Sequence, residues 1–221
     1  VRGVKHGLVA RGTRGLRLLD GDFSHNQKPR LYSGIEKESL VDWLSFHQNE
    51  KQEWLRFGAG VYLDGVTGGE IRNVTVRQGM NGLMLNRTDS LLIWNSDFSC
   101  NSGLGIGMYR SSHNRIVHNK VDWNVRGYSH RFYNRGQDSA GLLMYEQSSR
   151  NLVAYNSVTH SGDGLFLWAG QSTMDTGQGG SNDNLFYGND YSHAPTNGIE
   201  ATFSRNRFIN NRVEENWHGV W

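Results

Sequence analysis

The sequence is poor in several features that define other protein classes. It has one cysteine, Cys100, which excludes a framework of internal disulfides. It has only two prolines, so its 28 glycines do not indicate a low-complexity linker. No apolar run approaches the ~18 residues of a membrane span. The net charge of +2 is too balanced to indicate a nucleic-acid partner. Two residue types are in excess over the 221 positions: glycine, and asparagine with 21 copies.

A glycine followed by alternating apolar residues recurs along the whole chain. The motif begins at Gly7, Gly60, Gly82, Gly105, Gly141, Gly164, Gly198 and Gly219. The successive intervals are 53, 22, 23, 36, 23, 34 and 21 residues, so four of the seven lie between 21 and 23. A unit of about 22 residues cannot bury its own apolar face, so the copies must stack on one another. The longer intervals contain insertions, at about residues 27–59, 124–139 and 169–183.

Asparagine follows a second pattern, N-x-apolar-x-x-N-x-apolar. Its pairs are Asn114/Asn119, Asn151/Asn156, Asn184/Asn189 and Asn206/Asn211, and Asn95 and Asp20 take the second place in two earlier repeats. Two short alternating strands per repeat predict β structure, and the leucine spacing of leucine-rich repeats is absent. We therefore predict a parallel β-solenoid with an internal asparagine ladder. The side chains expected to be buried and bonded from coil to coil are Asn95, Asn119, Asn156, Asn189 and Asn211.

With these repeats the chain resembles the right-handed parallel β-helix proteins of the pectin-lyase-like superfamily, especially its short-repeat group with carbohydrate-binding and sugar-hydrolase members. The resemblance covers about residues 7–221. It implies an all-β fold, a right-handed parallel β-helix of about 7–8 coils forming a single domain over residues 1–221. Polysaccharide lyases, polygalacturonases, alginate epimerases and non-enzymatic solenoids share such repeats, so the resemblance leaves the reaction open. It also leads us to expect an extracytoplasmic protein.

The alternation assigns a face to each residue of the glycine strands. The first and third residues after each glycine are apolar and are expected to point inward. The outward set then includes Tyr109, Tyr145 and Trp168, on three consecutive coils about 4.8 Å apart. Flat aromatic faces suit sugar rings, so we predict a glycan groove here, flanked by the insertions. The alternative is that the insertions simply cover these rings.

Candidate catalytic groups lie beside this predicted groove. Glu146 follows Tyr145, Glu200 points outward, and Asp163 in "SGDG" resembles the Asp-Gly step of polygalacturonases, although the other segments of that family are absent. Carboxyl groups beside an aromatic wall suit acid–base catalysis. The alternative for Asp163 is a turn residue that caps its own backbone. The second insertion adds His130 as acid or base, with Arg131, Arg135 and Asp138 as substrate-binding candidates.

Searches for other sites in the sequence are negative. There is no phosphate-binding loop, zinc-binding helix or paired cysteine motif, so we predict no metal site and no cofactor. The segment 175–184 has oxygen-rich side chains that can ligate Ca²⁺, although a flexible loop is the alternative.

We predict a polysaccharide-active enzyme, a lyase or a glycoside hydrolase, with a poly- or oligosaccharide as its partner. The alternative is a non-catalytic carbohydrate-binding or structural β-helix module, and a third possibility is a NosD-like assembly protein. We predict that the groove brings Tyr145, Glu146, Trp168 and Glu200 together with His130 and Arg131. An enzyme requires His130, Arg131 or a pair of carboxylates to converge on one substrate position, whereas a binding module would show the aromatic residues without such convergence. The chain stops at Trp221 without a polar cap, so we expect further chain, or another chain, to cover that end.

Overall fold

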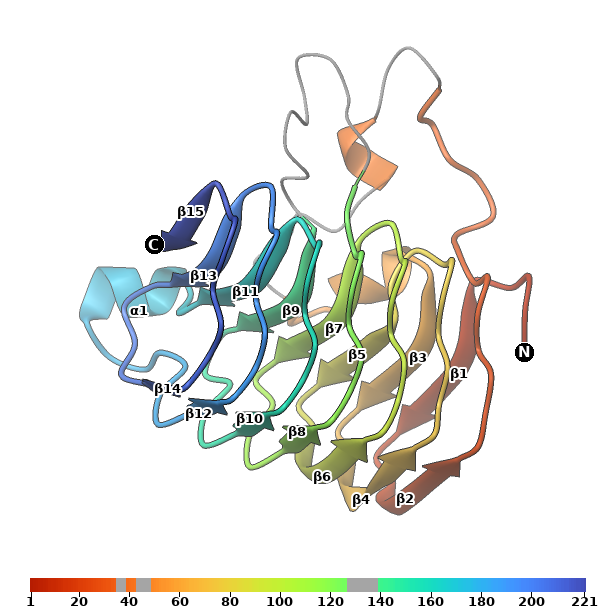
Figure 1. The fold of residues 1–221 in the computed structure, drawn as a ribbon. Coiled ribbons are helices and arrows are strands. Elements are labelled where there is room, and N and C mark those ends of the chain that lie inside the picture. The colour runs from red at the N-terminus through yellow and green to blue at the C-terminus, as the bar shows by residue number, and fades with distance from the viewer. Residues whose placement is uncertain (35–38, 43–48, 127–138) are drawn as a thin grey trace.

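The computed structural model describes residues 1–34, 39–42, 49–126 and 139–221, which form a coil of parallel strands (Figure 1). Every second strand belongs to an eight-stranded sheet, named sheet A here. Its strands, in both chain and spatial order, are β1 (His6–Arg11), β3 (Ala59–Asp64), β5 (Leu83–Asn86), β7 (Leu104–Tyr109), β9 (Ala140–Tyr145), β11 (Asp163–Trp168), β13 (Asn197–Ala201) and β15 (His218–Val220).

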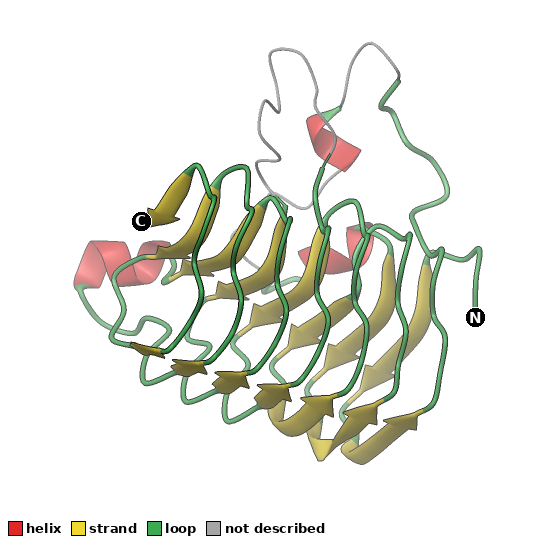
Figure 2. Ribbon diagram, in the orientation of Figure 1, coloured by secondary structure: helices red, strands yellow, loops and turns green. Residues whose placement is uncertain are grey.

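The remaining strands form a parallel seven-stranded sheet, named sheet B. Its strands are β2 (Arg14–Leu19), β4 (Thr67–Arg72), β6 (Asp89–Trp94), β8 (Arg115–Val117), β10 (Leu152–Ala154), β12 (Leu185–Tyr187) and β14 (Arg207–Ile209). Isolated parallel bridges, such as Thr75 with Asp97, close a third side of the coils. The two stacked sheets and the returning turns are clear in Figure 2. The predicted parallel β-helix of 7–8 coils is therefore confirmed.

The core lies between the two sheets and follows the predicted alternation. The inward residues of sheet A that are buried in it are Val61, Leu63, Leu83, Leu85, Ile106, Met108, Leu142, Met144, Leu165, Leu167 and Ile199. They meet Ile71, Ile93, Ile116, Val153 and Phe186 of sheet B in one continuous cluster. Close packing requires the strand-opening glycines from Gly7 to Gly198: a Cβ at Gly82, for example, would collide with the carbonyl oxygen of Gly105 in the next coil.

The asparagine ladder is present, but two residues assigned to it from the sequence, Asp20 and Asn95, lie one position before it. Asn119 Nδ2 donates to Asn156 Oδ1 (3.1 Å), Asn156 Nδ2 to Asn189 Oδ1 (2.9 Å), and Asn189 Nδ2 to Asn211 Oδ1 (3.0 Å). The first three side chains are buried and Asn211 is half-buried. A second ladder joins Asn114, Asn151, Asn184 and Asn206 in the same way.

The prediction for Asn95 was wrong, because the ladder place in its coil belongs to Ser96. The Ser96 N–H donates to Asn119 Oδ1 (3.1 Å), whereas Asn95 is exposed and has a φ of 49°. The residue one step before the ladder has a left-handed backbone in every coil, at Asp20, Asn73, Asn95, His118, Tyr155, Gly188 and Asn210. Asparagine and aspartate tolerate that conformation, so their presence there imitates the ladder pattern in the sequence.

The described parts of the insertions contain the helical segments. Among its described residues, the first insertion has two short 3₁₀ turns, η1 (Leu40–Asp42) and η2 (Glu53–Arg56). The third insertion contains α1 (Gln171–Thr176). Within the described residues, none of the helices is long and apolar enough to cross a membrane.

Candidate active site

The outer face of sheet A changes in character along the β-helix. The residue immediately before the strand-opening glycine contributes to this face. On the earlier coils it is apolar at Ala59, Leu104 and Ala140 and polar at His6 and Asn81. The three apolar residues belong to an outer cluster covered by Trp54 and Phe57 of the first insertion. On β11, β13 and β15 the same position carries Asp163, Asn197 and His218. Three consecutive strands at this end of the sheet therefore carry polar side chains at this position.

The Asn197 amide joins two carboxylates at this polar end. Its Nδ2 donates to Asp163 Oδ1 (3.0 Å) and to Glu200 Oε2 (2.9 Å), and its backbone N–H also donates to Asp163 Oδ1 (2.9 Å). His218 Nδ1 lies 3.0 Å from Asn197 Oδ1 and donates to it when that nitrogen is protonated. Asn197 and Asp163 are 1% and 5% exposed, and Glu200 is half-buried. We name these four residues the carboxylate–amide cluster.

The geometry of this cluster suits acid–base catalysis by two carboxyl groups. Because both side-chain contacts end on Asn197 Nδ2, Asp163 Oδ1 and Glu200 Oε2 are no more than about 6 Å apart, near the carboxyl spacing of retaining glycosidases. Burial raises the pKa of Glu200 above its usual value, and the Asn197 hydrogen bond opposes that rise only in part. Two carboxyl groups in unlike environments can divide the roles of acid and base.

The predicted aromatic column points outward, but most of it is covered. Tyr109 and Tyr145 are 1% and 4% exposed, because Trp54 packs edge-on against both rings, with ring centroids 5.7 and 6.2 Å apart. Trp168, on β11, is only partly buried. The expectation of an open three-ring surface is therefore wrong in this respect: the first insertion covers two of the rings and only Trp168 remains partly accessible.

The third predicted carboxylate, Glu146, does not join the carboxylate–amide cluster. In the sheet register Leu143, Phe166 and Glu200 are aligned on neighbouring strands. Glu146 lies three residues beyond Leu143, so it is displaced from Glu200 by about 10 Å along the strand direction and by two strand spacings, about another 10 Å, across the sheet. It is 7% exposed, and its carboxylate faces Gly170 at the start of α1. Burial raises the pKa of Glu146; nearby Arg110 lowers it, and Glu50 raises it further.

Four of the predicted site residues, His130, Arg131, Arg135 and Asp138, lie outside the described residues. In the predicted Ca²⁺ segment, the Asp175 carboxylate accepts from Gln171 (2.8 Å) and Asp183 pairs with Arg205 (3.4 Å). Over the part of the chain that the structure describes, no three His, Cys, Asp or Glu side chains gather as metal ligands.

Two residues of the cluster, Asn197 and His218, were missed by the sequence analysis. Each immediately precedes a strand-opening glycine, as Asp163 does. Polar residues also precede Gly7 and Gly82, so a polar residue at this position is not by itself a signal, but only the last three coils carry polar residues there in succession.

A comparison with protein families bears on this architecture. The model of a right-handed β-helix region matches residues 1–125 and, in a second match, residues 59–221, which together span the chain. The chain belongs to the right-handed β-helix family. No curated protein matches this β-helix. The family match defines the scaffold.

Proposed function

We propose that this right-handed β-helix protein hydrolyses a glycosidic bond, with Asp163 and Glu200 as its catalytic carboxyl groups. The observation that carries the proposal is the single Asn197 nitrogen that contacts both carboxylates. Glycoside hydrolysis generally needs two carboxyl groups that flank the bond to be broken. The right-handed β-helix scaffold fits carbohydrate-active and carbohydrate-binding proteins, which makes a glycan the natural ligand class. We place such an enzyme outside the cytoplasm.

The two carboxyl groups are assigned different roles. The raised pKa of Glu200 favours a protonated acid, which donates its proton to the leaving oxygen as the glycosidic C–O bond breaks. Asp163 accepts two N–H donors of Asn197, which suits an ionised nucleophile that bonds to the anomeric carbon. Water then cleaves that glycosyl ester, its oxygen remains on the sugar, and its proton returns to Glu200. Trp168 lies on the same strand as Asp163 and offers a ring against which the sugar packs.

The test compares Glu200→Gln with wild type on pectins, alginates and neutral glycans, following new reducing ends and the ultraviolet absorbance of unsaturated uronates. Glutamine keeps the shape of the side chain and cannot protonate the leaving group, so we expect cleavage to fall by about 10²–10⁴-fold. The melting temperature should stay nearly unchanged. Glu214→Gln, an exposed substitution of the same kind, is the matched control and should keep full activity.

Two outcomes would replace this proposal. Binding of a glycan without cleavage by the wild-type protein would favour the non-catalytic module, because the cluster would then serve recognition alone. Unsaturated products would indicate elimination, in which a basic residue such as His130 removes a proton and Arg131 neutralises a uronate. Retention of full cleavage by Glu200→Gln would exclude the assigned acid.

A further inference from the structure

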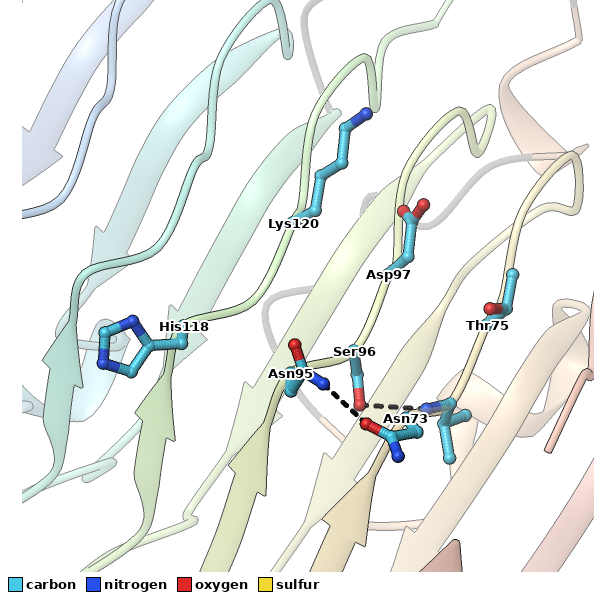
Figure 3. Close-up of a pocket in the computed structure, with 8 residues that line it drawn as sticks. Asn73, Thr75, Asn95, Ser96, Asp97, His118 and Lys120 are labelled. Atoms are coloured by element: carbon cyan, nitrogen blue, oxygen red, sulfur yellow. Dashed lines mark hydrogen bonds between the residues drawn. The ribbon is translucent and has the colours of Figure 1, made fainter. Parts of the chain in front are cut away.

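A shallow hollow of about 370 Å³ lies on another side of the β-helix, where the chain leaves sheet B (Figure 3). Three consecutive coils form it, those of β4, β6 and β8, and none of its residues belongs to sheet A. The lining residues are Asn73, Val74, Thr75, Asn95, Ser96, Asp97, His118 and Lys120. A cavity of this size accommodates a small ligand of one or two sugar rings.

The lining of the hollow is polar and electrically balanced. Asn73, Asn95 and Thr75 supply amide and hydroxyl groups, while Asp97 and Lys120 supply one negative and one positive charge. Neither charge dominates, so the hollow lacks the excess of cations that recognises phosphates and the excess of carboxylates that holds divalent cations. It also lacks the apolar walls that suit lipids. Mixed donors and acceptors of this kind match a neutral molecule rich in hydroxyl groups.

The amides are held in place before any ligand binds. Asn95 Nδ2 donates to Asn73 Oδ1 (2.6 Å), and Asn73 Nδ2 donates to Asp20 Oδ1 (2.7 Å). Figure 3 shows the Asn95 amide oxygen directed away from Asn73. These bonds fix which atom of the Asn95 amide faces a ligand, and a preformed orientation lowers the entropic cost of binding.

Aromatic rings extend the hollow along the next two coils. The His118 ring stacks on Tyr155 (centroids 5.0 Å apart, planes at 10°), and Tyr155 meets Tyr187 edge-on at 5.3 Å. Tyr155 is 52% exposed and has a φ of 56°, although glycine fills the equivalent place in the next coil at Gly188. A large ring kept at a left-handed position and open to solvent points to a role other than packing.

We propose that this hollow and the adjoining rings form a second, non-catalytic glycan site that holds a neutral oligosaccharide. The polar lining would bond the sugar hydroxyls, and the faces of His118 and Tyr155 would contact sugar C–H groups. The ligand class deepens the proposed function, but binding here needs neither Asp163 nor Glu200. Such a site would keep a polymer on the enzyme while sheet A acts on another part of it.

The test is NMR titration of the ¹⁵N-labelled protein with neutral xylo-, manno- and cello-hexaoses. We expect saturable shifts at the side-chain amides of Asn73 and Asn95 and at the backbone of His118, unchanged in Glu200→Gln. Tyr155→Gly and Asn95→Gly should each raise Kd about tenfold, equivalent to about 1.4 kcal/mol. Glycine suits both positions because their backbones are left-handed, so folding should be preserved.

The matched control is Asn210→Gly, the same substitution at the same exposed left-handed position in the β14 coil, three coils beyond the last coil that lines the hollow. It should bind like wild type. Shifts confined to residues of sheet A would overturn the second site and leave the proposed hydrolysis intact. Shifts at the hollow without any cleavage would support the second site and count against the proposed reaction. No saturable shift with any of the three hexaoses, or an equal loss of affinity in the Asn210→Gly control, would overturn the inference.

Discussion

Replacing Asn156 by leucine tests the asparagine ladder as a source of stability. Asn156 Oδ1 accepts from the backbone N–H of Asn119 (2.9 Å) and from Asn119 Nδ2 (3.1 Å). Its own Nδ2 donates to the Ile116 carbonyl (2.8 Å) and to Asn189 Oδ1 (2.9 Å). Leucine has a similar size but offers neither donor nor acceptor. The Asn119 N–H would therefore lose its acceptor in the dry interior, whereas the Ile116 carbonyl lies in the paired β8–β10 ladder and would lose only an additional donor.

An orphaned buried group costs ~1–3 kcal/mol, so Asn156→Leu should lower the free energy of unfolding by ~1–3 kcal/mol. Urea denaturation followed by both circular dichroism and tryptophan fluorescence would measure it. Asn95→Gly is the comparison, because Asn95 is exposed and makes only the solvent-facing contact with Asn73. A loss below ~1 kcal/mol for Asn156→Leu, or an equal loss for Asn95→Gly, would refute the idea that buried amide pairing holds the coils together.

Two further predictions concern the outer face of sheet A. Trp54→Ala removes the buried ring that covers Tyr109 and Tyr145, so urea denaturation should show a loss of ~3–5 kcal/mol in the free energy of unfolding. The control Trp123→Asn changes an exposed ring and should lose far less. Equal losses in the two variants would contradict the covering role of Trp54. Burial raises the pKa of Glu146 above its unfolded value of 4.5, so between these two pKa values the native state binds more protons than the unfolded state. The free energy of unfolding therefore falls as the pH rises from 4.5 through the raised pKa. Glu146→Gln should therefore abolish this fall and unfold at higher urea concentration at neutral pH; a lower midpoint would mean that attraction to Arg110 outweighs burial.

The repeating features of the fold could be predicted from the sequence because each has a local physical cause. The strand-opening glycines, such as Gly82, are required by the close approach of the next coil, and the alternation after them defines the core. The ladder register failed at Asn95 because two different positions favour asparagine for different reasons. One needs a buried amide, and its neighbour needs a residue that tolerates a left-handed backbone.

The candidate site was predictable only in part. Asp163 and Glu200 were selected as carboxylates beside a predicted groove, and the structure brings them to the same amide. The separation of Glu146 depends on strand register, which the spacing of the repeats alone does not fix. The burial of Tyr109 depends on how the first insertion folds back over sheet A, a long-range contact without a local sequence signal.

The most direct test of the proposed hydrolysis is the configuration of the first product. Incubation of the protein with a cleaved glycan, followed immediately by ¹H NMR of the newly formed reducing end, distinguishes retention from inversion. Because Asp163 and Glu200 oxygens lie no more than about 6 Å apart, we expect retention of the anomeric configuration. Inversion, or an unsaturated sugar in place of a reducing end, would contradict the assignment of this pair as nucleophile and acid.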